Sequence, residues 1–236
     1  MADRRHPLQR VLNTLGFRLS RYRPPPPDPL HALGIDLLLD VGASVGKYAQ
    51  TVRERGYAGR LVCFEPLPAA HAVLTRRASG DPLWQVHERC ALGAAAGEAV
   101  VNIAGNSYSS SLLPMLPAHA EAAPQSVYVG QAATPVVALD DVFARYRADA
   151  RRIYLKIDTQ GFEAEVLAGA VRTLPEIFAV HMELSIVPLY EGQKLYRHFF
   201  DFFAAQGFEL WLLEEEFIDP RTGRMLQFNA TFTRPS

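Results

Sequence analysis

The chain has 236 residues, 49% of them apolar and 21% charged, which is enough for one well-buried globular domain. Its formal net charge of -1 supplies no global field for nucleic acid or an anionic membrane, so we expect no nucleic-acid partner. The two cysteines, Cys63 and Cys90, form neither a disulfide framework nor a metal-binding spacing, which favours a reducing, cytoplasmic setting.

The N-terminal part of the chain is predicted to be an appendage. Residues 7–20 carry apolar side chains at helical spacing among arginines, which predicts a short amphipathic basic helix. We expect it to pack on its own domain or on a second subunit, with binding to a membrane or to substrate as the alternative. No run resembles an export signal or approaches the roughly 20 residues of a transmembrane segment. Four consecutive prolines at 24–27 stop any preceding helix. We therefore predict an N-terminal helix and proline-rich linker over 1–34 and a main domain over 35–236.

From residue 35 onward, short apolar runs alternate with amphipathic helical stretches. This alternation predicts parallel strands joined by helices on the faces of one sheet. No long helix is evident between the third and fourth main strands, where an extra strand, a polar loop and a short helix are expected. The predicted strands cover 35–41, 59–65, 83–92, 98–105, 151–158 and 177–185, a strand leading into a short helix covers 134–148, and the predicted helices cover 45–55, 67–78, 161–174 and 194–206.

The end of the chain has a different pattern. Two apolar runs at 208–215 and 226–234 flank the turn-forming segment 219–223, which predicts an antiparallel hairpin. Together with the preceding alternation, this predicts an α/β fold: a Rossmann-like, doubly wound sheet that is mostly parallel and carries a C-terminal antiparallel hairpin strand.

The segment "DVGASVG" at 40–46 lies between the first predicted strand and helix. Gly42, Ala43 and Gly46 leave little side-chain bulk beside the unpaired N–H groups of a helix start, so a nucleotide could approach the backbone closely. The same residues suit an ordinary tight turn, and this segment alone leaves both interpretations open.

Two acidic residues favour a ligand. Glu65 ends the second predicted strand, where a carboxylate can accept hydrogen bonds from both ribose hydroxyls, although an acid that caps the next helix is the alternative. Asp40 in the first turn would repel a pyrophosphate, whereas it suits the ammonium and sulfonium groups of S-adenosylmethionine. We therefore expect adenosylmethionine in preference to NAD.

Six segments, in this order and at these spacings, resemble the FkbM-type S-adenosylmethionine-dependent methyltransferases: "DVGASVGKYA", "FEPLP", "NSYSSSL", "LDDVF", "YLKIDTQGFEAEVLAGA" and "ELSIVPLYEG". The resemblance runs from about residue 35 to residue 233. It implies a class I Rossmann-like methyltransferase, usually an O-methyltransferase acting on sugars or on polyketide and other specialised products. It also implies a cofactor site at Asp40, Gly42, Ala43, Gly46, Glu65 and Ala91.

The chemistry is expected in the second half of the chain. Asp158 follows a strand at the edge where ligands of such sheets bind, which directs it toward the methyl donor, although it could serve only as a helix N-cap. Period-two alternation puts Ala179, His181 and Glu183 on one face, approaching the same edge. The catalytic candidates are therefore Asp158, His181 and Glu183.

Two hypotheses explain how an acceptor hydroxyl would lose its proton. One is a general base, either His181, whose ordinary pKa is about 6.5, or Asp158. A buried histidine bonded to the backbone is equally compatible with the sequence. The other is a divalent cation such as Mg²⁺, held by Asp158 and Glu183, which would lower the pKa of the hydroxyl.

Acceptor contacts are expected from two further segments. Serine-rich loops such as "NSYSSSL" are commonly plain connections, but the resemblance favours a loop that closes over cofactor or acceptor, with Tyr108 and Ser110 as contacts. Tyr190 either packs against a sugar ring or fills an apolar interface.

We therefore expect an adenosylmethionine-dependent O-methyltransferase whose small hydroxyl acceptor is a sugar in a glycoside, glycan or specialised metabolite. The alternatives are an N-methyltransferase acting on a small amine, a cofactor-binding or scaffold protein without turnover, and an NAD(P)-dependent oxidoreductase. A homo-oligomer is compatible with the amphipathic N-terminal helix.

Overall fold

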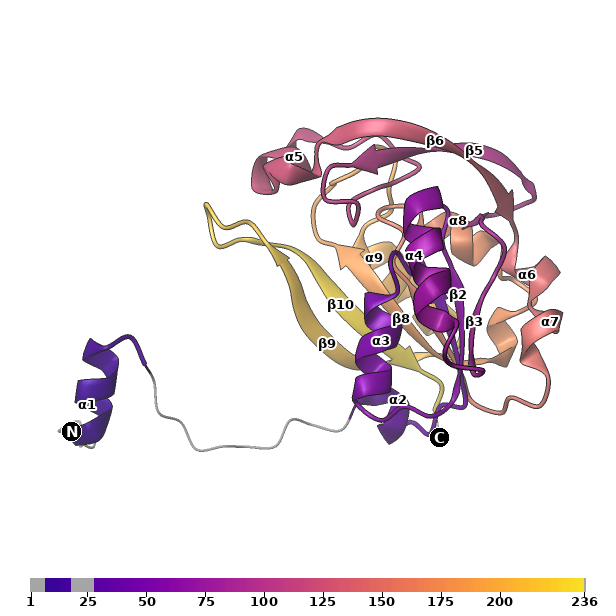
Figure 1. The fold of residues 1–236 in the computed structure, drawn as a ribbon, viewed down its shortest axis with the longest axis horizontal. Helices are drawn as coiled ribbons and strands as arrows, with labels where there is room; N and C mark the ends of the chain where they lie inside the picture. Colours follow the sequence, from indigo (N-terminus) through magenta and orange to yellow (C-terminus); the bar gives the residue numbers. More distant parts are fainter. Residues whose placement is uncertain (1–6, 18–27, 236) are drawn as a thin grey trace.

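A computed structural model describes residues 7–17 and 28–235 (Figure 1). Helix α1 (Pro7–Thr14) forms the first part of the predicted N-terminal helix, and it is shorter than predicted because the chain turns at residues 15–16. Residues 18–20 of that prediction and the proline run at 24–27 lie outside the described residues, and the division of the chain at residue 34 stays a prediction. None of the helices in the described part of the chain has the length and apolar character that crossing a bilayer requires.

The main sheet has seven strands in the order β3-β2-β1-β7-β8-β10-β9. Strands β3, β2, β1, β7 and β8 are parallel, whereas β10 is antiparallel to both of its neighbours. The predicted α/β fold, mostly parallel with a C-terminal antiparallel hairpin, is thereby confirmed. The strands are β1 (Leu37–Val41), β2 (Arg60–Phe64), β3 (Trp84–Val86), β7 (Ile153–Ile157), β8 (Ile177–Ser185), β9 (Glu209–Ile218) and β10 (Met225–Thr233).

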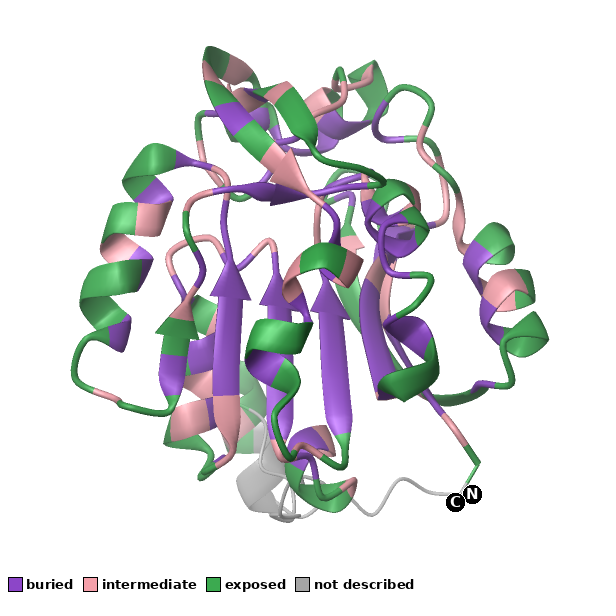
Figure 2. Ribbon diagram, turned by 90° about the vertical axis from the view of Figure 1, so that its right-hand side faces the viewer, coloured by how far each residue is buried: buried purple, intermediate pink, exposed green. Residues whose placement is uncertain are grey.

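Helices cover both faces of this sheet, and its central strands are buried between them (Figure 2). Leu37 and Leu39 of β1 belong to one core, whereas Leu38 between them belongs to the other. A strand buried on both faces must be apolar throughout, which explains the continuous run at 37–39. One face packs α2 (Pro29–Ala32), α3 (Lys47–Glu54) and α4 (Pro68–Ala78), and the other packs α6 (Leu139–Val142), α7 (Ala144–Arg147), α8 (Glu163–Ala168) and α9 (Tyr196–Ala205).

A second, three-stranded sheet was not predicted. It contains β4 (Ala91–Leu92), β6 (Tyr128–Val137) and β5 (Gly97–Ala104) in that order. The single strand expected over 83–92 is wrong, because its start joins the main sheet as β3 and its end joins this one as β4. With α5 (Pro117–Ala122) and the 3₁₀ turn Pro124–Ser126, the second sheet arches over one end of the main sheet (Figure 1).

The helix expected over 161–174 is shorter than predicted. Helix α8 ends at Ala168, and turns lead from there to the 3₁₀ helix Leu174–Glu176. Gly169 lies so close to Gly93 that an added Cβ would be 1.9 Å from the Gly93 carbonyl oxygen. Contact between these two backbones therefore fixes where the helix ends.

The end of β1 is packed tightly against the end of β7. Gly42 has a φ of 77°, and a Cβ added to it would lie 1.9 Å from the main-chain oxygen of Asp158. Only glycine fits such a position without displacing backbone. The turn after β1 is therefore built on the end of β7.

We expect Gly42→Ala to destabilise the protein well beyond the cost of its backbone conformation. Gly56→Ala is the matched control, because Gly56 has a φ of 93° but open space where the Cβ would be. The control should lower the free energy of unfolding by about 1–2 kcal/mol, the cost of a left-handed L-residue, and Gly42→Ala by clearly more. Urea unfolding of both variants measures the difference, and equal losses would contradict the contact.

Candidate active site

Polar and glycine residues gather at one edge of the main sheet because parallel strands end there. The adjacent strands β1 and β7 are followed by Gly42 and Asp158, β2 by Glu65, and β8 carries Glu183 near its end. Ligands of open α/β sheets bind at this edge. Two pockets lie here.

The loop after β1 is held by the neighbouring strand. The main-chain N–H groups of Gly42 and Ala43 both donate to the Phe64 carbonyl at 3.1 Å. Gly46, with a φ of 81°, precedes the first turn of α3, and its added Cβ would lie 2.7 Å from the side chain of Leu74. Gly46 therefore serves the packing of the loop rather than the lining of a pocket.

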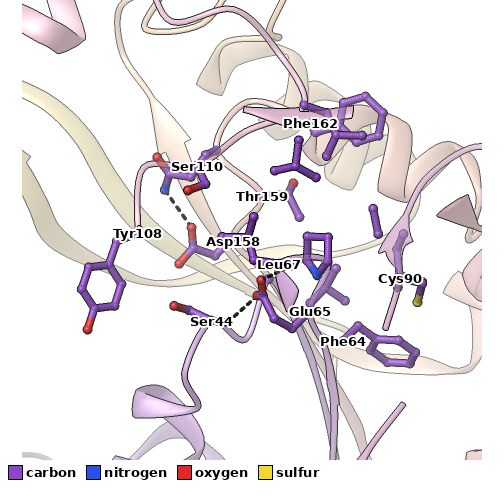
Figure 3. A pocket seen from close by; sticks show the side chains of 18 of the residues that line it. Ser44, Phe64, Glu65, Leu67, Cys90, Tyr108, Ser110, Asp158, Thr159 and Phe162 are labelled. Carbon is purple, nitrogen blue, oxygen red and sulfur yellow. Dashed lines mark hydrogen bonds between the residues drawn. The ribbon is translucent and has the colours of Figure 1, made fainter. Parts of the chain in front are cut away.

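The first pocket lies between this loop and the second sheet (Figure 3). Most of its wall is apolar, and Glu65 and Asp158 enter it from the ends of β2 and β7, the two strands that flank β1. An apolar slot with a carboxylate beside it suits a nucleoside. The apolar lining includes Phe64, Leu67, Ala91, Leu92, Val101, Leu112 and Phe162.

Glu65 is held firmly at the wall of the first pocket. Its side chain is buried, and its two oxygens accept the main-chain N–H groups of Ser44 at 2.7 Å and Leu67 at 2.8 Å. Burial raises the pKa of Glu65 to about 7, although both N–H donors favour the ionised form. The carboxyl therefore has a fixed orientation and titrates near neutrality.

Ser44 is the residue of this loop whose side chain indicates a ligand-binding role. Its φ of 49° is left-handed, and it lines both pockets. Its Oγ is buried and has no hydrogen-bond partner among the described residues. A buried hydroxyl without a partner is uncommon in folded proteins, so a bound ligand is its natural partner.

The second pocket, of about 550 Å³, has the size of a small-molecule site. It lies between α3 and the sheet, with Tyr48 of α3 and His181 of β8 in its wall. Acidic side chains of β9 form another part of the wall, Glu214, Glu215 and Glu216. The two pockets share Gly42, Ser44, Tyr108, Asp158 and Gln160.

A buried lysine lies between the two acidic residues of the central strands. Lys156 Nζ is 3.0 Å from Asp40 Oδ1 and 3.5 Å from Asp158 Oδ2. Burial disfavours the charge of Lys156, but these carboxylates outweigh it and raise the pKa of its ammonium group. Asp40 is fully buried and lines neither pocket, so it acts on the site through Lys156.

Asp158 and Glu183 are bridged by one amide. Gln160 Nε2 donates to Asp158 Oδ1 at 2.9 Å and to Glu183 Oε2 at 2.6 Å. Gln227 Nε2 also donates to Glu183 Oε2 at 2.6 Å. Two acidic side chains from neighbouring strands therefore lie together at the junction of the pockets, as the sequence predicts.

The titration properties of Glu183 and His181 differ from those of the free side chains. Burial, reinforced by the charge of Asp158, raises the pKa of Glu183 well above its usual range. Burial lowers the pKa of His181 to about 4, and Lys156 acts in the same direction. His181 Nδ1 lies 3.0 Å from Thr231 Oγ1, and the ring stacks between aromatic neighbours. His181 therefore lacks the ordinary pKa for which it was considered as a base.

The donor set does not fit a divalent cation. No group of three or more His, Cys, Asp or Glu side chains in the described ranges is arranged to hold a metal ion. The amide nitrogen of Gln160 lies between Asp158 and Glu183, and the ammonium group of Lys156 lies beside Asp158. Hydrogen-bond donors already lie between and beside these carboxylates, so the pair does not form a site for a divalent cation.

The predicted site residues separate into three groups. The first pocket is lined by Gly42, Glu65, Ala91, Tyr108, Ser110 and Asp158. The second pocket is lined by Gly42, Ala43, Tyr108, Asp158, His181 and Glu183. Neither pocket is lined by Asp40, Gly46 or Tyr190. Tyr190 is 1% exposed, and its hydroxyl donates to Gln160 Oε1 at 2.7 Å. It supports Gln160 rather than facing a ligand.

The sequence reasoning missed Ser44, Lys156 and Gln160. Lys156 is a charged residue inside an otherwise apolar strand, and such a residue is a visible anomaly in the sequence. Asp40 is its register partner on β1, and Asp158 follows two positions later. Ser44 and Gln160 carry no comparable signal, because polar residues are ordinary in turns.

We expect Lys156→Met to lower the free energy of unfolding by about 3–5 kcal/mol, because it leaves Asp40 buried without a counter-charge. Adding Asp40→Asn should recover much of that loss. Arg145→Met is the control, since Arg145 and its partner Glu88 are 54% and 70% exposed and such a pair contributes about 1 kcal/mol or less. Equal effects of the two methionine variants in urea unfolding would contradict the role of the buried pair.

Structural likeness to solved proteins is weak. Aeropyrum pernix fibrillarin with natively bound S-adenosyl-L-methionine shares 11% identity and a TM-score of 0.47, over 85% of this chain and 66% of its own. A TehB-like SAM-dependent methyltransferase from Corynebacterium glutamicum shares 14% identity and a TM-score of 0.41, over 85% of this chain and 80% of its own. Likeness at this level carries no statement about the site. No curated protein matches the chain.

The sequence itself matches a known family. The model of the "Methyltransferase FkbM domain" family aligns with residues 40–210, well over half of the chain. The match spans the loop after β1, the residues that line both pockets, and the strand that carries Glu183. The chain therefore belongs to the FkbM methyltransferase family.

Proposed function

We propose that the protein transfers a methyl group from S-adenosylmethionine to a hydroxyl of a small acceptor, with the donor in the first pocket and the acceptor in the second. The observation that carries this proposal is the junction of the two pockets at Asp158, Gln160 and Tyr108. A donor and an acceptor bound on either side of this junction would meet beside Asp158 and Glu183.

The residues of the first pocket fit the proposed cofactor. Its apolar wall around Ala91 suits adenine, and the oriented carboxyl of Glu65 suits the ribose hydroxyls. The unpartnered Oγ of Ser44 can bond the polar end of the methionine part, and Asp158 favours its positive charge. When bound, adenosylmethionine supplies a methyl carbon activated by a neighbouring sulfonium.

The remaining task of the chain is to orient the acceptor and to accept its proton. Burial raises the pKa of Glu183, which makes its ionised form a stronger proton acceptor than an ordinary carboxylate, whereas it lowers the pKa of His181 to about 4, which weakens His181 as a base. Methyl transfer then forms a carbon–oxygen bond, breaks the carbon–sulfur bond and moves the hydroxyl proton to the carboxylate. Lys156 keeps neighbouring Asp158 oriented.

A sugar is the acceptor class that the second pocket favours. The wall combines the rings of Tyr48 and Tyr108 with several carboxylates and the amide of Asn229. Rings can stack on the faces of a pyranose, and carboxylates and amides bond its hydroxyls. We therefore propose a sugar hydroxyl in a glycoside, glycan or specialised metabolite.

An amine acceptor is the second candidate, because the wall is rich in negative charge. Glu214 and Glu216 form no ion pair with a basic side chain in the described part of the chain, and the charges of Asp158 and Glu214 help burial to raise the pKa of Glu216. Such a wall attracts a protonated amino group. Paired acceptors that differ only in hydroxyl or amine at one carbon would distinguish the two candidates.

The setting proposed for the reaction is the reducing cytoplasm. Cys63 and Cys90 are both free and buried thiols. Burial raises the pKa of Cys90 to about 12, which keeps its thiol protonated and unreactive. Packing alone accounts for both residues, in agreement with a compartment that does not form disulfides.

We expect the affinity for adenosylmethionine to fall as the pH is lowered from about 8 to about 6. Glu65, with a pKa of about 7, takes up a proton over this range and then accepts ribose hydrogen bonds less well. Glu65→Gln should weaken binding about tenfold and remove the pH dependence, whereas Glu88→Gln outside the pockets should do neither. Calorimetric titration measures this, and identical curves for the parent and Glu65→Gln would remove Glu65 from the cofactor site.

We expect Glu183→Gln to bind adenosylmethionine nearly as the parent does and Asp158→Asn to bind it more weakly, because it loses a charge beside the methionine part. Both variants, saturated with donor, should transfer the methyl group at least about 100-fold more slowly. His181→Gln should lose less than about tenfold, because its lowered pKa makes it a poor base. The assay follows a tritiated methyl group from the donor into a panel of glycosides and amino glycosides, with and without EDTA.

The panel also tests the wider proposal. EDTA should leave the rate unchanged, and loss of transfer on chelation would contradict the interpretation of the carboxylate pair. Selective adenosylmethionine binding without transfer to any member of a broad panel would favour the binding or scaffold alternative. A loss in His181→Gln as large as that in Glu183→Gln would return the role of base to His181.

A further inference from the structure

Gln160 occupies an unusual backbone position at the junction of the two pockets. Its φ of 54° is left-handed, and the residue is 9% exposed. Ser111 Oγ donates to the Gln160 main-chain carbonyl at 2.7 Å, which holds the turn from the loop after β5. A residue other than glycine keeps such a conformation only when its surroundings enforce it, and such positions concentrate at functional sites.

The hydrogen bonds of the Gln160 amide leave it only one orientation. Both N–H bonds of Nε2 are used, one to Asp158 Oδ1 and one to Glu183 Oε2. The hydroxyl of Tyr190 donates to Oε1 at 2.7 Å. A flipped amide would direct its oxygen at two carboxylate oxygens and would lose both bonds, so the network itself selects this orientation.

These contacts leave one oxygen of Glu183 for a ligand. Both amides, from Gln160 and Gln227, donate to Oε2. Within the described part of the chain, no hydrogen bond to Oε1 accompanies them, and Glu183 lines the second pocket. Holding Oε2 therefore sets the direction of Oε1.

We propose that Gln160 is a positioning residue for methyl transfer, whose amide clamps Asp158 and Glu183 so that Glu183 Oε1 is presented to the acceptor. This inference rests on the proposed function, in which Glu183 accepts the proton. Gln160 touches neither reacting atom in this scheme. It acts through the carboxylates that it holds.

Gln227 is a natural comparison within the same chain. Its amide bonds the same oxygen of Glu183 at the same 2.6 Å distance as Gln160. It reaches neither Asp158 nor the lining of either pocket. Replacing each glutamine by methionine therefore removes the same bond to Glu183, but only Gln160→Met opens the clamp.

The pKa of Glu183 can be measured without any acceptor, and it depends on the hydrogen bond that Gln160 donates. A hydrogen bond donated to an ionised carboxylate lowers its pKa, so removing the bond raises the pKa of Glu183. Both variants retain the other charged or titratable groups that act on Glu183 or on its neighbour Asp158, and only Gln160→Met also removes an amide from Asp158. These groups are Asp158, Lys156, Glu163, Tyr190, Glu216 and His181.

The experiment combines a carboxyl titration with a transfer assay. Carbon-13 NMR of the full chain labelled at glutamate Cδ should show the Glu183 midpoint raised by about one pH unit in both Gln160→Met and Gln227→Met. At a pH above both midpoints, methyl transfer should fall about 30-fold or more in Gln160→Met and only a few-fold in Gln227→Met. Tyr190→Phe removes the hydrogen bond to Gln160 Oε1 but keeps the Gln160 amide. It should raise the Glu183 midpoint by less than Gln160→Met does.

Each readout can overturn the inference. A Glu183 midpoint that is unchanged in Gln160→Met and in Tyr190→Phe would show that no clamp exists. Equal loss of transfer in the two methionine variants would show that Gln160 only supports the fold. If the parent methylates no acceptor, the proposed function fails, and the titration still decides whether Gln160 holds Glu183. Should Gln160→Met not fold, Tyr190→Phe carries the titration alone.

Discussion

The site depends on the close contact between the ends of β1 and β7. The Asp158 main-chain N–H donates to the Val41 carbonyl at 3.0 Å, and the Asp158 carbonyl fills the space where Gly42 would carry a side chain. This contact joins the loop of the first pocket to the acidic strand end of the second. The proposed donor and acceptor sites are therefore parts of one rigid edge, and their relative position is set by the sheet.

Electrostatics at this edge follow from burial. One buried ammonium, Lys156, is shared by Asp40 and Asp158, so the centre of the sheet carries more negative than positive charge. Glu65 and Glu183 both have raised pKa values because burial disfavours their ionised forms. A cationic methyl donor would relieve this excess of negative charge, which is the physical reason to prefer adenosylmethionine over a ligand that brings a pyrophosphate.

Much of the fold could be predicted because the sequence signals are periodic. Alternation in β8 correctly assigned His181 and Glu183 to one face, since both line the second pocket, and the glycines after β1 correctly marked a turn at the edge where the parallel strands end. The division of 83–92 between two sheets was not predictable, since a short apolar run has no signal for which sheet it joins.

The site was harder to predict than the fold because it depends on contacts between distant residues. Asp40 was interpreted as a cofactor contact, but its partner is Lys156, 116 positions later in the sequence and adjacent in the sheet. Tyr190 was considered as a sugar platform, but it is buried against Gln160. Burial also changes the chemistry of His181 in a way that residue type alone does not reveal.

The most direct test of the account is calorimetric titration of S-adenosylmethionine and, separately, of NAD into the purified full chain after removal of carried-over ligand. We expect binding of adenosylmethionine at one site per chain and no binding of NAD. Binding of NAD with no response to adenosylmethionine would contradict the account, because the first pocket would then belong to a different chemistry.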